Sequence, residues 1–235
     1  MQTKKWGPPG WDFLQSVAFK YPLKPTFAER KDYCVFFHCL GKQLPCKYCR
    51  ESWCLFESEL PIGQYINTNR LPIWIYLMHN KVNNKLRLQG NPVPPDPTFE
   101  DVSDKYYSKR DICTQNFWDF LHVITFNYSL EPTDEQKYDT KKFFKTLCTV
   151  FPCNVCRHIF KNLWNEINID SFLESRYKLT YWLFLVHQKV NNTLIKLGYS
   201  NIKELLEFEP LCEKYENMRA QCNSSKKTCS VPMKK

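Results

Sequence analysis

Apolar residues recur with helical spacing along most of the chain. From Trp11 to Ala18 they fall at i, i+3, i+6 and i+7, which predicts one apolar face of a helix. Comparable patterns predict further helices over residues 32–40, 49–60 and 71–87, whereas strand-like alternation is weak throughout. The pattern therefore predicts an all-α fold built from small helical bundles.

The same pattern occurs twice, and the matching blocks keep their order. Residues 11–26 read WDFLQSVAFKYPLKPT and residues 118–133 read WDFLHVITFNYSLEPT, with nine of the sixteen positions identical. Two shorter pairs match as well: LPCKYC at 44–49 with FPCNVC at 151–156, and LMHNKVNNKL at 77–86 with LVHQKVNNTL at 185–194. Because the offsets are 107 or 108 residues each time, we expect a tandem duplication of one domain.

The duplication divides the chain into three predicted parts. Residues 1–105 form the first domain, 106–198 a divergent second copy, and 199–235 a C-terminal helical extension with a cysteine-containing tail. Four prolines between residues 92 and 97 predict a linker or an extended strap after the first copy, since proline interrupts helices.

The cysteine content of the chain bears on its chemistry. The 235 residues include 12 cysteines, and the N-terminal sequence MQTKKWGPPGW lacks the apolar core of a secretory signal. We expect a cytoplasmic protein with no membrane span, since no run of 18 apolar residues occurs. Cytosolic proteins rarely carry so many cysteines unless their thiols bind metal or perform redox chemistry.

The formal net charge is +9, which raises the question of a nucleic-acid partner. However, the lysines are spread along the chain, and only the tail carries a small basic cluster. We therefore expect no nucleic acid among the partners.

Cys46 and Cys49 form a CxxC motif at the predicted start of a helix. A helix N-terminus offers unpaired N–H groups and partial positive charge, which favour the reactive thiolate. The alternatives are a zinc half-site, a buried pair, or a thioredoxin-like site. Zinc would need a second pair of ligands, which Cys153 and Cys156 could supply only if the copies met face to face. A thioredoxin-like site would need a βαβ pattern, so we expect redox chemistry and no metal.

The sequence HNKVNNKL places His79 and Asn83 on one helix face, beside Val82. A polar edge on an otherwise apolar helix is costly unless something satisfies it. A single helical histidine is more often a satisfied core residue, but the neighbouring asparagines favour contact with a ligand. Lys85 and Arg87 follow closely and could meet phosphates.

These three blocks together resemble the Erv/ALR family of FAD-dependent sulfhydryl (thiol) oxidases. WGPPGW, the CxxC after Leu-Pro, and HNxVNxxL are similar in particular to the versions encoded by large DNA viruses. The resemblance covers most of residues 6–105 and returns in weaker form over 114–197. It implies a four- or five-helix bundle that holds FAD, oxidises a protein or thioredoxin-like dithiol with O2, and forms a homodimer. For a viral protein, it implies the host cytoplasm or the virion.

The resemblance also implies roles for individual residues. Cys49 matches the flavin-proximal thiol, and Cys46 the thiol that exchanges with incoming dithiols. The positions that match flavin or nucleotide contacts, or the start of the family pattern, are Trp6, Gly7, Trp11, Gln15, Tyr21, His79, Asn80, Val82, Asn83, Lys85 and Leu86.

The two copies depart from the family pattern in different places. Gln15 stands where the family has a histidine, whereas the second copy has His122 there. The second copy lacks the WGP start, and its HN reads His187-Gln188. We expect FAD in the first copy. The rival interpretation, supported by Gln15, is a flavin-free helical-repeat scaffold with structural disulfides.

Other cysteines have further candidate roles. Cys153 and Cys156 are a possible second redox pair, or a structural bond in a degenerate copy. Cys212 and Cys229 are separated by sixteen residues, which is similar to a structural pair in cellular relatives, and are a possible shuttle or structural pair. Buried, unreactive thiols are expected at Cys34, Cys39, Cys54 and Cys148.

Overall fold

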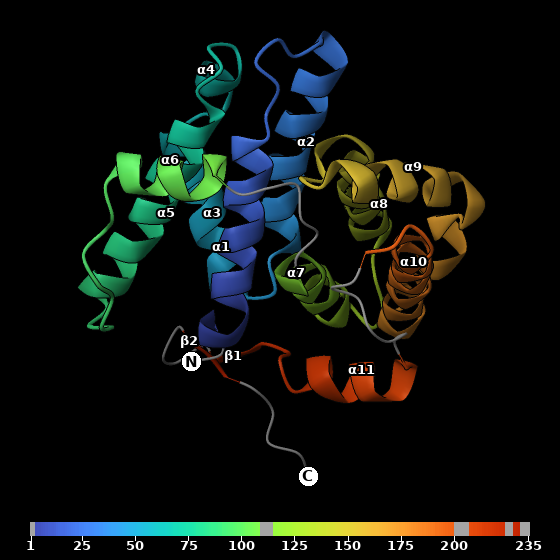
Figure 1. The fold of residues 1–235 in the computed structure, drawn as a ribbon. Coiled ribbons are helices and arrows are strands. Elements are labelled where there is room, and N and C mark those ends of the chain that lie inside the picture. The colour runs from blue at the N-terminus through green and yellow to red at the C-terminus, as the bar shows by residue number, and fades with distance from the viewer. Residues whose placement is uncertain (1–2, 109–114, 200–206, 224–227, 231–235) are drawn as a thin grey trace.

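The computed structural model describes residues 3–108, 115–199, 207–223 and 228–230. Within these ranges the chain is almost entirely helical (Figure 1). Repeat 1 consists of α1 (Thr3–Phe19), α2 (Phe27–Gln43), α3 (Lys47–Glu59), α4 (Gly63–Ile66), α5 (Leu71–Leu88) and α6 (Phe99–Tyr107). Repeat 2 consists of α7 (Gln115–Phe126), α8 (Asp134–Val150), α9 (Asn154–Glu166), the short 3-10 helix η1 (Ile169–Phe172), α10 (Arg176–Lys196) and α11 (Phe208–Glu216). A two-stranded antiparallel hairpin follows, with β1 (Gln221–Asn223) and β2 (Thr228–Ser230).

The predicted all-α duplication is confirmed, and the helices are longer than the apolar pattern indicated. The α1 helix already begins at Thr3 and includes Pro8 and Pro9. Proline has no N–H to donate, so the first turns of α1 contain fewer backbone hydrogen bonds and depend more on packing. The α2 helix begins at Phe27 because Thr26 and Glu29 form a capping box, in which each side chain bonds the other's backbone.

Helix α6 lies in the segment that the prolines had marked as a linker or strap. Thr98 and Asp101 form a second capping box, which starts this helix immediately after the last proline. The prolines themselves lie in a non-helical stretch, as predicted. The short hairpin in the polar tail was not predicted either, because only three residues form each strand.

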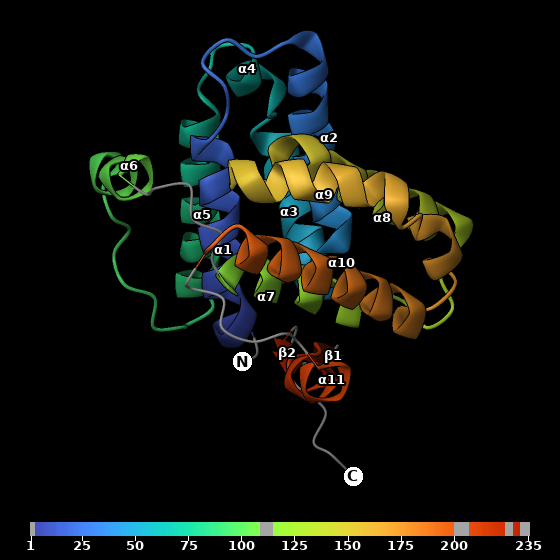
Figure 2. The same ribbon diagram turned by 45° about the vertical axis from the view of Figure 1, so that its right-hand side comes forward.

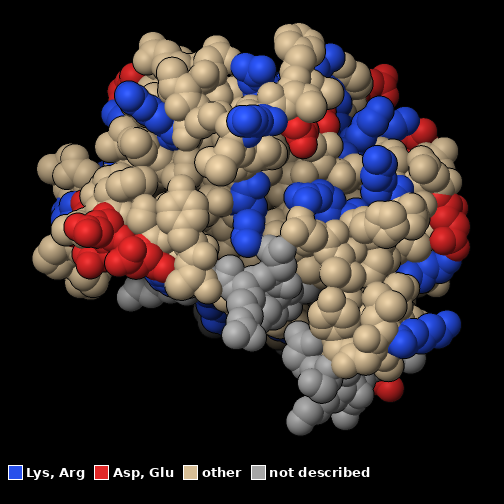
Figure 3. Space-filling model, turned by 45° about the horizontal axis from the view of Figure 1, so that its top comes forward, with Lys and Arg blue, Asp and Glu red and all other residues tan. Residues whose placement is uncertain are grey.

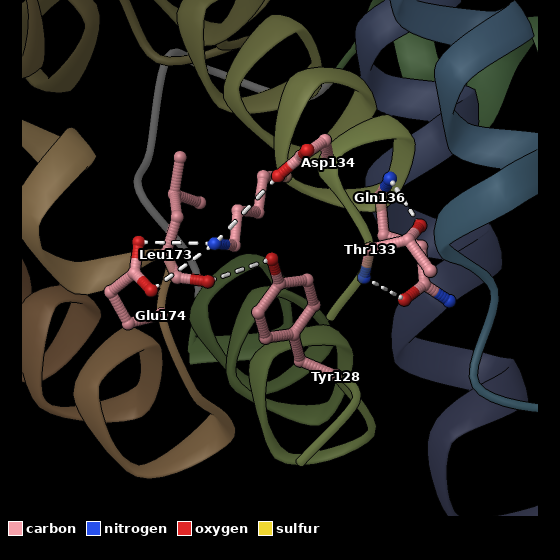
Figure 4. Close-up of polar contacts among 7 residues, drawn as sticks. Tyr128, Thr133, Asp134, Gln136, Leu173 and Glu174 are labelled. Carbon is pink, nitrogen blue, oxygen red and sulfur yellow. Dashed lines mark hydrogen bonds and ion pairs between the residues drawn. The ribbon is translucent and has the colours of Figure 1, made fainter. Parts of the chain in front are cut away.

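A tyrosine hydrogen bond recurs at equivalent positions of the two repeats. In repeat 1, Tyr21 Oη donates to the backbone oxygen of Ile66 at 3.1 Å. In repeat 2, Tyr128 Oη donates to the backbone oxygen of Leu173 at 3.1 Å, as Figure 4 shows. Each bond ties the end of the first helix of the repeat to a chain segment about 45 residues later. The duplication therefore extends to the internal hydrogen bonds.

Helices α6 and α11 are also counterparts. Tyr106 Oη of α6 donates to Asp12 Oδ1 at 3.1 Å, and Tyr215 Oη of α11 donates to Asp119 Oδ1, where Asp12 and Asp119 are equivalent residues of α1 and α7. In both views α6 lies beside α1 and α5, while α11 lies below α7 (Figure 1, Figure 2). Helix α11 therefore completes repeat 2, although the sequence suggested an extension that begins at residue 199.

The two repeats pack around an approximate two-fold axis. Helix α2 lies on α8, and α1 on α7. Equivalent residues face each other across this interface: Phe36 stacks on Phe143 with ring centroids 5.4 Å apart, and the centroids of Phe13 and Phe120 are 6.0 Å apart. A residue meets its own counterpart only close to a two-fold axis, so the repeats are related as the subunits of a symmetric dimer are.

Polar contacts across the interface are reciprocal as well. Lys42 Nζ lies 2.8 Å from Asp139 Oδ2, and Thr149 Oγ1 donates to Asp32 Oδ2 at 2.6 Å. Lys42 and Thr149 occupy equivalent positions, as do Asp32 and Asp139. One cluster of buried apolar side chains runs through both repeats, so the interface is part of a common core. Within the described residues, no helix has the length and hydrophobicity needed to cross a bilayer.

Candidate active site

Three helices of repeat 1 bring the predicted site residues together. Helix α1 carries Trp11 and α5 carries His79, and their rings stack with centroids 4.0 Å apart and planes 16° apart. The ring of Trp53 of α3 is tilted by 34° to that of Trp11, with 6.4 Å between centroids. Trp53 follows Cys49 by four residues, so both occupy the same face of α3. Trp53 was missed from the sequence, although its spacing from Cys49 was a usable signal.

All the predicted cofactor-binding residues lie on or beside two of these helices. Helix α1 carries Trp6, Gly7, Trp11 and Gln15, Tyr21 follows it, and α5 carries His79, Asn80, Val82, Asn83, Lys85 and Leu86. Trp6, Gln15 and Tyr21 are buried, whereas the others are partly exposed. Six of the predicted residues are therefore on α5, which packs against α1.

The CxxC motif lies at the N-terminus of α3, as predicted. Cys46 is the N-cap residue, and its backbone oxygen accepts hydrogen bonds from the N–H groups of Cys49 and Arg50, each at 3.0 Å. Cys49 is therefore in the first turn, where the partial positive charge of the helix favours a thiolate. Cys46 is 3% exposed, whereas Cys49 is half-buried. The structure thus makes Cys49 the more accessible of the two.

Electrostatics keep the histidine of this site neutral. Burial lowers the pKa of His79 to about 4, against an ordinary value of 6.5, with nearby Asp96 opposing the shift. A neutral imidazole has one donor and one acceptor nitrogen, and its ring can stack on a flat partner. His79 is therefore suited to stacking and hydrogen bonding at neutral pH.

Asp96, from the proline-rich segment, organises the exposed end of α5. Asn83 Nδ2 donates to Asp96 Oδ1 at 2.7 Å, and Arg87 Nη2 lies 2.6 Å from the same oxygen. The hydrogen bond from Arg87 lowers the pKa of Asp96. On the next face, Lys85 Nζ bonds Ser52 Oγ of α3. The acceptors Asp96 and Ser52 were not identified from the sequence, because each is distant along the chain from the side chain that it binds on α5.

Several buried polar atoms of α1 and α3 have no hydrogen-bond partner among the described residues: Trp6 Nε1, Gln15 Oε1 and Trp53 Nε1. The same holds for Trp118 Nε1 and His122 Nδ1 in repeat 2. Buried polar atoms are normally paired, and an unpaired one often marks a missing ligand or water. Gln15 Oε1 can accept from an N–H group, and the two indole N–H groups can donate. The donor set therefore fits a flat ligand whose edge carries both kinds of polar atom.

Repeat 2 reproduces the aromatic stack but encloses it. Trp118 stacks on His187 at 3.9 Å between centroids, with 9° between planes. His122, the counterpart of Gln15, has its Nε2 atom 3.0 Å from Nδ1 of His187. Burial lowers the pKa of His122 to about 3 and that of His187 well below 6.5. The ring of Tyr215 stacks on that of His122, with centroids 4.9 Å apart.

The second CxxC motif is buried. Cys153 is the N-cap of α9 and Cys156 lies in its first turn, with exposed fractions of 3% and 0%. The N–H group of Cys156 donates to Cys153 Sγ at 3.2 Å. The geometry at the helix start is thus kept, but the motif is less accessible than its counterpart in repeat 1.

The remaining cysteines differ partly from expectation. Cys212 lies on α11, and Cys229 lies in β2, where its backbone is paired in register with that of Cys222. The role of Cys212 and Cys229 as a shuttle or structural pair stays a prediction. Burial raises the pKa of the thiols of Cys34, Cys39 and Cys148. The expectation of a buried thiol is wrong for Cys54, which is exposed on the outer face of α3.

Metal ligation was one alternative for the cysteine pairs. Among the residues that the structure describes, no group of three or more His, Cys, Asp or Glu side chains could hold a metal ion. Within the described part of the chain, neither CxxC motif is therefore accompanied by the further ligands that a structural zinc site needs.

One known protein family matches the chain in two places. The sequence model of the Erv1 / Alr family matches residues 9–100 and again residues 115–207. The mitochondrial FAD-linked sulfhydryl oxidase ERV1 of Saccharomyces cerevisiae is 37% identical over 79 residues, which are 34% of this chain and 41% of the yeast protein. A probable FAD-linked sulfhydryl oxidase, R368 of Acanthamoeba polyphaga mimivirus, is 33% identical over 85 residues, 35% of this chain and 59% of the viral protein.

A plant relative matches a longer stretch. FAD-linked sulfhydryl oxidase ERV1 of Arabidopsis thaliana is 27% identical over 133 residues, 57% of this chain and 62% of the plant protein. The chain thus spans between about two fifths and three fifths of these curated relatives. No solved structure matches it. Because the family model covers both repeats and well over half of the residues, the chain belongs to the Erv1 / Alr family.

Proposed function

We propose that the chain is an FAD-dependent sulfhydryl oxidase with its active site in repeat 1. The observation that carries the proposal is the meeting of α1, α3 and α5: Trp11 stacks on His79, and the centroid of Trp53, one helical turn after Cys49, lies 6.4 Å from that of Trp11. Relatives from yeast, a plant and a virus are all named FAD-linked sulfhydryl oxidases. A redox dithiol beside a flat aromatic site is the arrangement that flavin-linked thiol oxidation needs.

The residues present fit a flavin. The isoalloxazine edge carries N–H groups, one of which can pair with the unpartnered buried atom Gln15 Oε1. Trp11 and neutral His79 offer aromatic faces for stacking. Lys85 and Arg87, in the last turn of α5, supply positive charge for phosphates.

The thiol chemistry uses the oxidised form of the Cys46–Cys49 pair. A substrate thiolate attacks one sulfur, forms a mixed disulfide and displaces the other cysteine as a thiolate. The second substrate thiol then attacks the mixed disulfide, which releases the substrate disulfide and leaves both cysteines reduced. The helix N-terminus stabilises the displaced thiolate, so it improves the leaving group.

FAD, when bound, supplies the two-electron chemistry that returns the cysteine pair to its disulfide and passes the electrons to O2. The overall reaction is balanced, since two thiols and one O2 give one disulfide and one H2O2. The chain's own residues hold the cofactor, position Cys49 and keep His79 neutral.

Two measurements on the purified protein test the proposal. An absorbance spectrum from 300 to 600 nm, before and after denaturation, should show a released flavin, and an oxygen electrode should record O2 uptake with dithiothreitol. A colourless protein that also fails to take up added FAD would overturn the proposal. It would favour the flavin-free scaffold.

The proposed partners are a dithiol protein and O2, with no nucleic acid and no membrane. On the face in Figure 3, Lys and Arg lie in separate groups among uncharged and acidic residues, which does not favour a phosphate backbone. We place the protein in the cytoplasm, where thiols are kept reduced and an oxidase would supply disulfides that do not otherwise form. Subcellular fractionation tests this location, and recovery with secreted proteins would contradict it.

A further inference from the structure

We infer that repeat 2 is a built-in partner subunit: it supports the α1 helix of the repeat 1 site and has no open site of its own. The inference rests on the proposed function of repeat 1. It has two parts, since it predicts a monomer with one flavin per chain and assigns a positioning role to Phe120 of repeat 2.

The first step is the interface between the repeats. Phe36 meets its counterpart Phe143, and Lys42 and Asp139 are matched by the reciprocal contact of Thr149 with Asp32. Such self-complementary contacts are typical of two-fold dimers. Phe36 and Phe143 are both fully buried, so the α2 face that a second copy would need is already covered by α8. Repeat 2 thus takes the place of the second subunit in the homodimer that the sequence suggested.

Repeat 2 also contacts the start of α1 through Phe120. The ring of Phe120 stacks on Trp6, with centroids 6.3 Å apart and planes 28° apart. A Cβ atom on Gly10 would lie 2.8 Å from Phe120 Cε2, so only glycine lets α1 approach this ring. Pro8 and Pro9 deprive this part of α1 of hydrogen bonds, so its position depends on packing. Phe120 therefore positions the segment that leads directly to Trp11.

The two sites differ in exposure at equivalent positions. In repeat 1, the site residues Trp11, His79, Val82, Asn83 and Leu86 are all partly exposed. Their counterparts in repeat 2, Trp118, His187, Val190, Asn191 and Leu194, are all buried. One consistent difference at five positions shows that the second site is covered, whereas the first is accessible.

Side chains of repeat 2 itself cover the second site. His122 replaces Gln15, and its ring lies between His187 and Tyr215, bonded to the first and stacked on the second. Its Nε2 atom is thus paired within repeat 2, whereas its Nδ1 atom, like Gln15 Oε1 in repeat 1, has no partner among the described residues. The buried second CxxC, Cys153 and Cys156, likewise offers no exposed thiol to a substrate.

The first test uses the wild-type protein. Light scattering after gel filtration should give a mass near the 28.2 kDa of one chain, and denaturation should release one flavin per chain. A two-chain mass or two flavins per chain would overturn the inference. Absence of any flavin would count against the proposed function itself, so the two failures are distinguishable.

A matched pair of variants locates the flavin. His79→Gln and His187→Gln make the same change at equivalent positions of the two repeats. We expect His79→Gln to lose bound flavin and His187→Gln to keep one flavin per chain. Flavin lost from His187→Gln and kept in His79→Gln would overturn the inference.

A second pair tests the positioning role. Phe120→Ala and Phe126→Ala each remove a buried ring from α7, but the structure shows a ring contact with repeat 1 only for Phe120. At temperatures where both variants are folded by circular dichroism, we expect flavin affinity to fall by about tenfold or more only in Phe120→Ala. Phe120→Leu, which keeps much of the volume, should restore most of it. Equal affinity in Phe120→Ala, Phe120→Leu and Phe126→Ala would exclude the positioning role.

Discussion

The Nε2 atom of His122 and the Nδ1 atom of His187 lie 3.0 Å apart in the interior of repeat 2. One nitrogen must donate a proton and the other must accept it, so this contact requires that the accepting ring be unprotonated on that atom. Both imidazoles are buried, which opposes a second proton on either ring. The pair is therefore a structural element that acid should break.

Acid should destabilise the protein through the partly exposed His79 and the buried His122 and His187. The pKa of His79 falls from 6.5 to about 4 on folding, that of His122 to about 3, and that of His187 also falls. Between these values and pH 6.5 the unfolded chain binds more protons, so the free energy of unfolding decreases as pH falls. Each histidine contributes a slope of up to about 1.4 kcal/mol per pH unit. Urea unfolding at pH 7.5, 6.5, 5.5 and 4.5 measures it.

A variant of His122 measures how much of the acid effect comes from repeat 2. His122→Gln installs the residue that repeat 1 has at this position, and it should flatten the dependence below pH 6.5 relative to wild type. The exposed His158 offers a matched control, since His158→Gln should leave the slope unchanged. An identical slope in wild type and His122→Gln would contradict the explanation.

The catalytic cysteines should be separable from a neighbour on the same helix. We expect Cys46→Ser and Cys49→Ser to abolish O2 uptake with dithiothreitol, because neither can form the redox disulfide. Cys54→Ser, on the exposed side of α3, should retain the wild-type rate. Flavin content should stay near wild type in all three variants. Full activity in Cys49→Ser would contradict the assignment.

Local sequence predicted much of this molecule because the duplicated blocks contain the information for each helix. The WDFL segments, the CxxC starts and the HNxVN segments all lie on helices, and the three blocks of repeat 1 meet at one site. Helix α6 was missed because prolines dominate the preceding stretch, although the capping pair Thr98 and Asp101 was readable. Ser52 and Asp96 were missed for a different reason, because they meet their partners on α5 only in the folded chain.

The closure of repeat 2 could not be predicted either. His122 matches the family pattern where Gln15 departs from it, and the sequence left open whether repeat 2 is a degenerate copy or a second redox centre. In the structure the same side chain contacts His187 and Tyr215 and is fully buried. The role of a residue at a matching position therefore depends on which side chains cover it.

The interface between the repeats should be a major source of stability. Phe36→Ala and Phe143→Ala each leave a cavity at the approximate two-fold axis, so we expect each to lower the free energy of unfolding by about 3–5 kcal/mol. Because the two rings contact each other, the double variant should lose less than the sum of the single losses. Phe27→Ala is the control, since Phe27 is 81% exposed and should change stability by about 0.5 kcal/mol or less. Strict additivity would show that the stacked contact contributes little.

Asp96 should influence cofactor binding although it lies outside the family motifs. It holds Asn83 and Arg87 at the end of α5, where we place the phosphates of FAD. Asp96→Ala releases both side chains, and we expect flavin affinity to weaken by about fivefold, as for a partly exposed ion pair worth about 1 kcal/mol. Asp96→Asn keeps an oxygen for Asn83 but removes the charge that pairs with Arg87. If the charge is what matters, Asp96→Asn behaves as Asp96→Ala does, and added salt reduces the difference from wild type. Tighter flavin binding in Asp96→Ala would instead mean that Asp96 competes with the phosphates for Arg87, and that the proline-rich segment must move away before the cofactor binds.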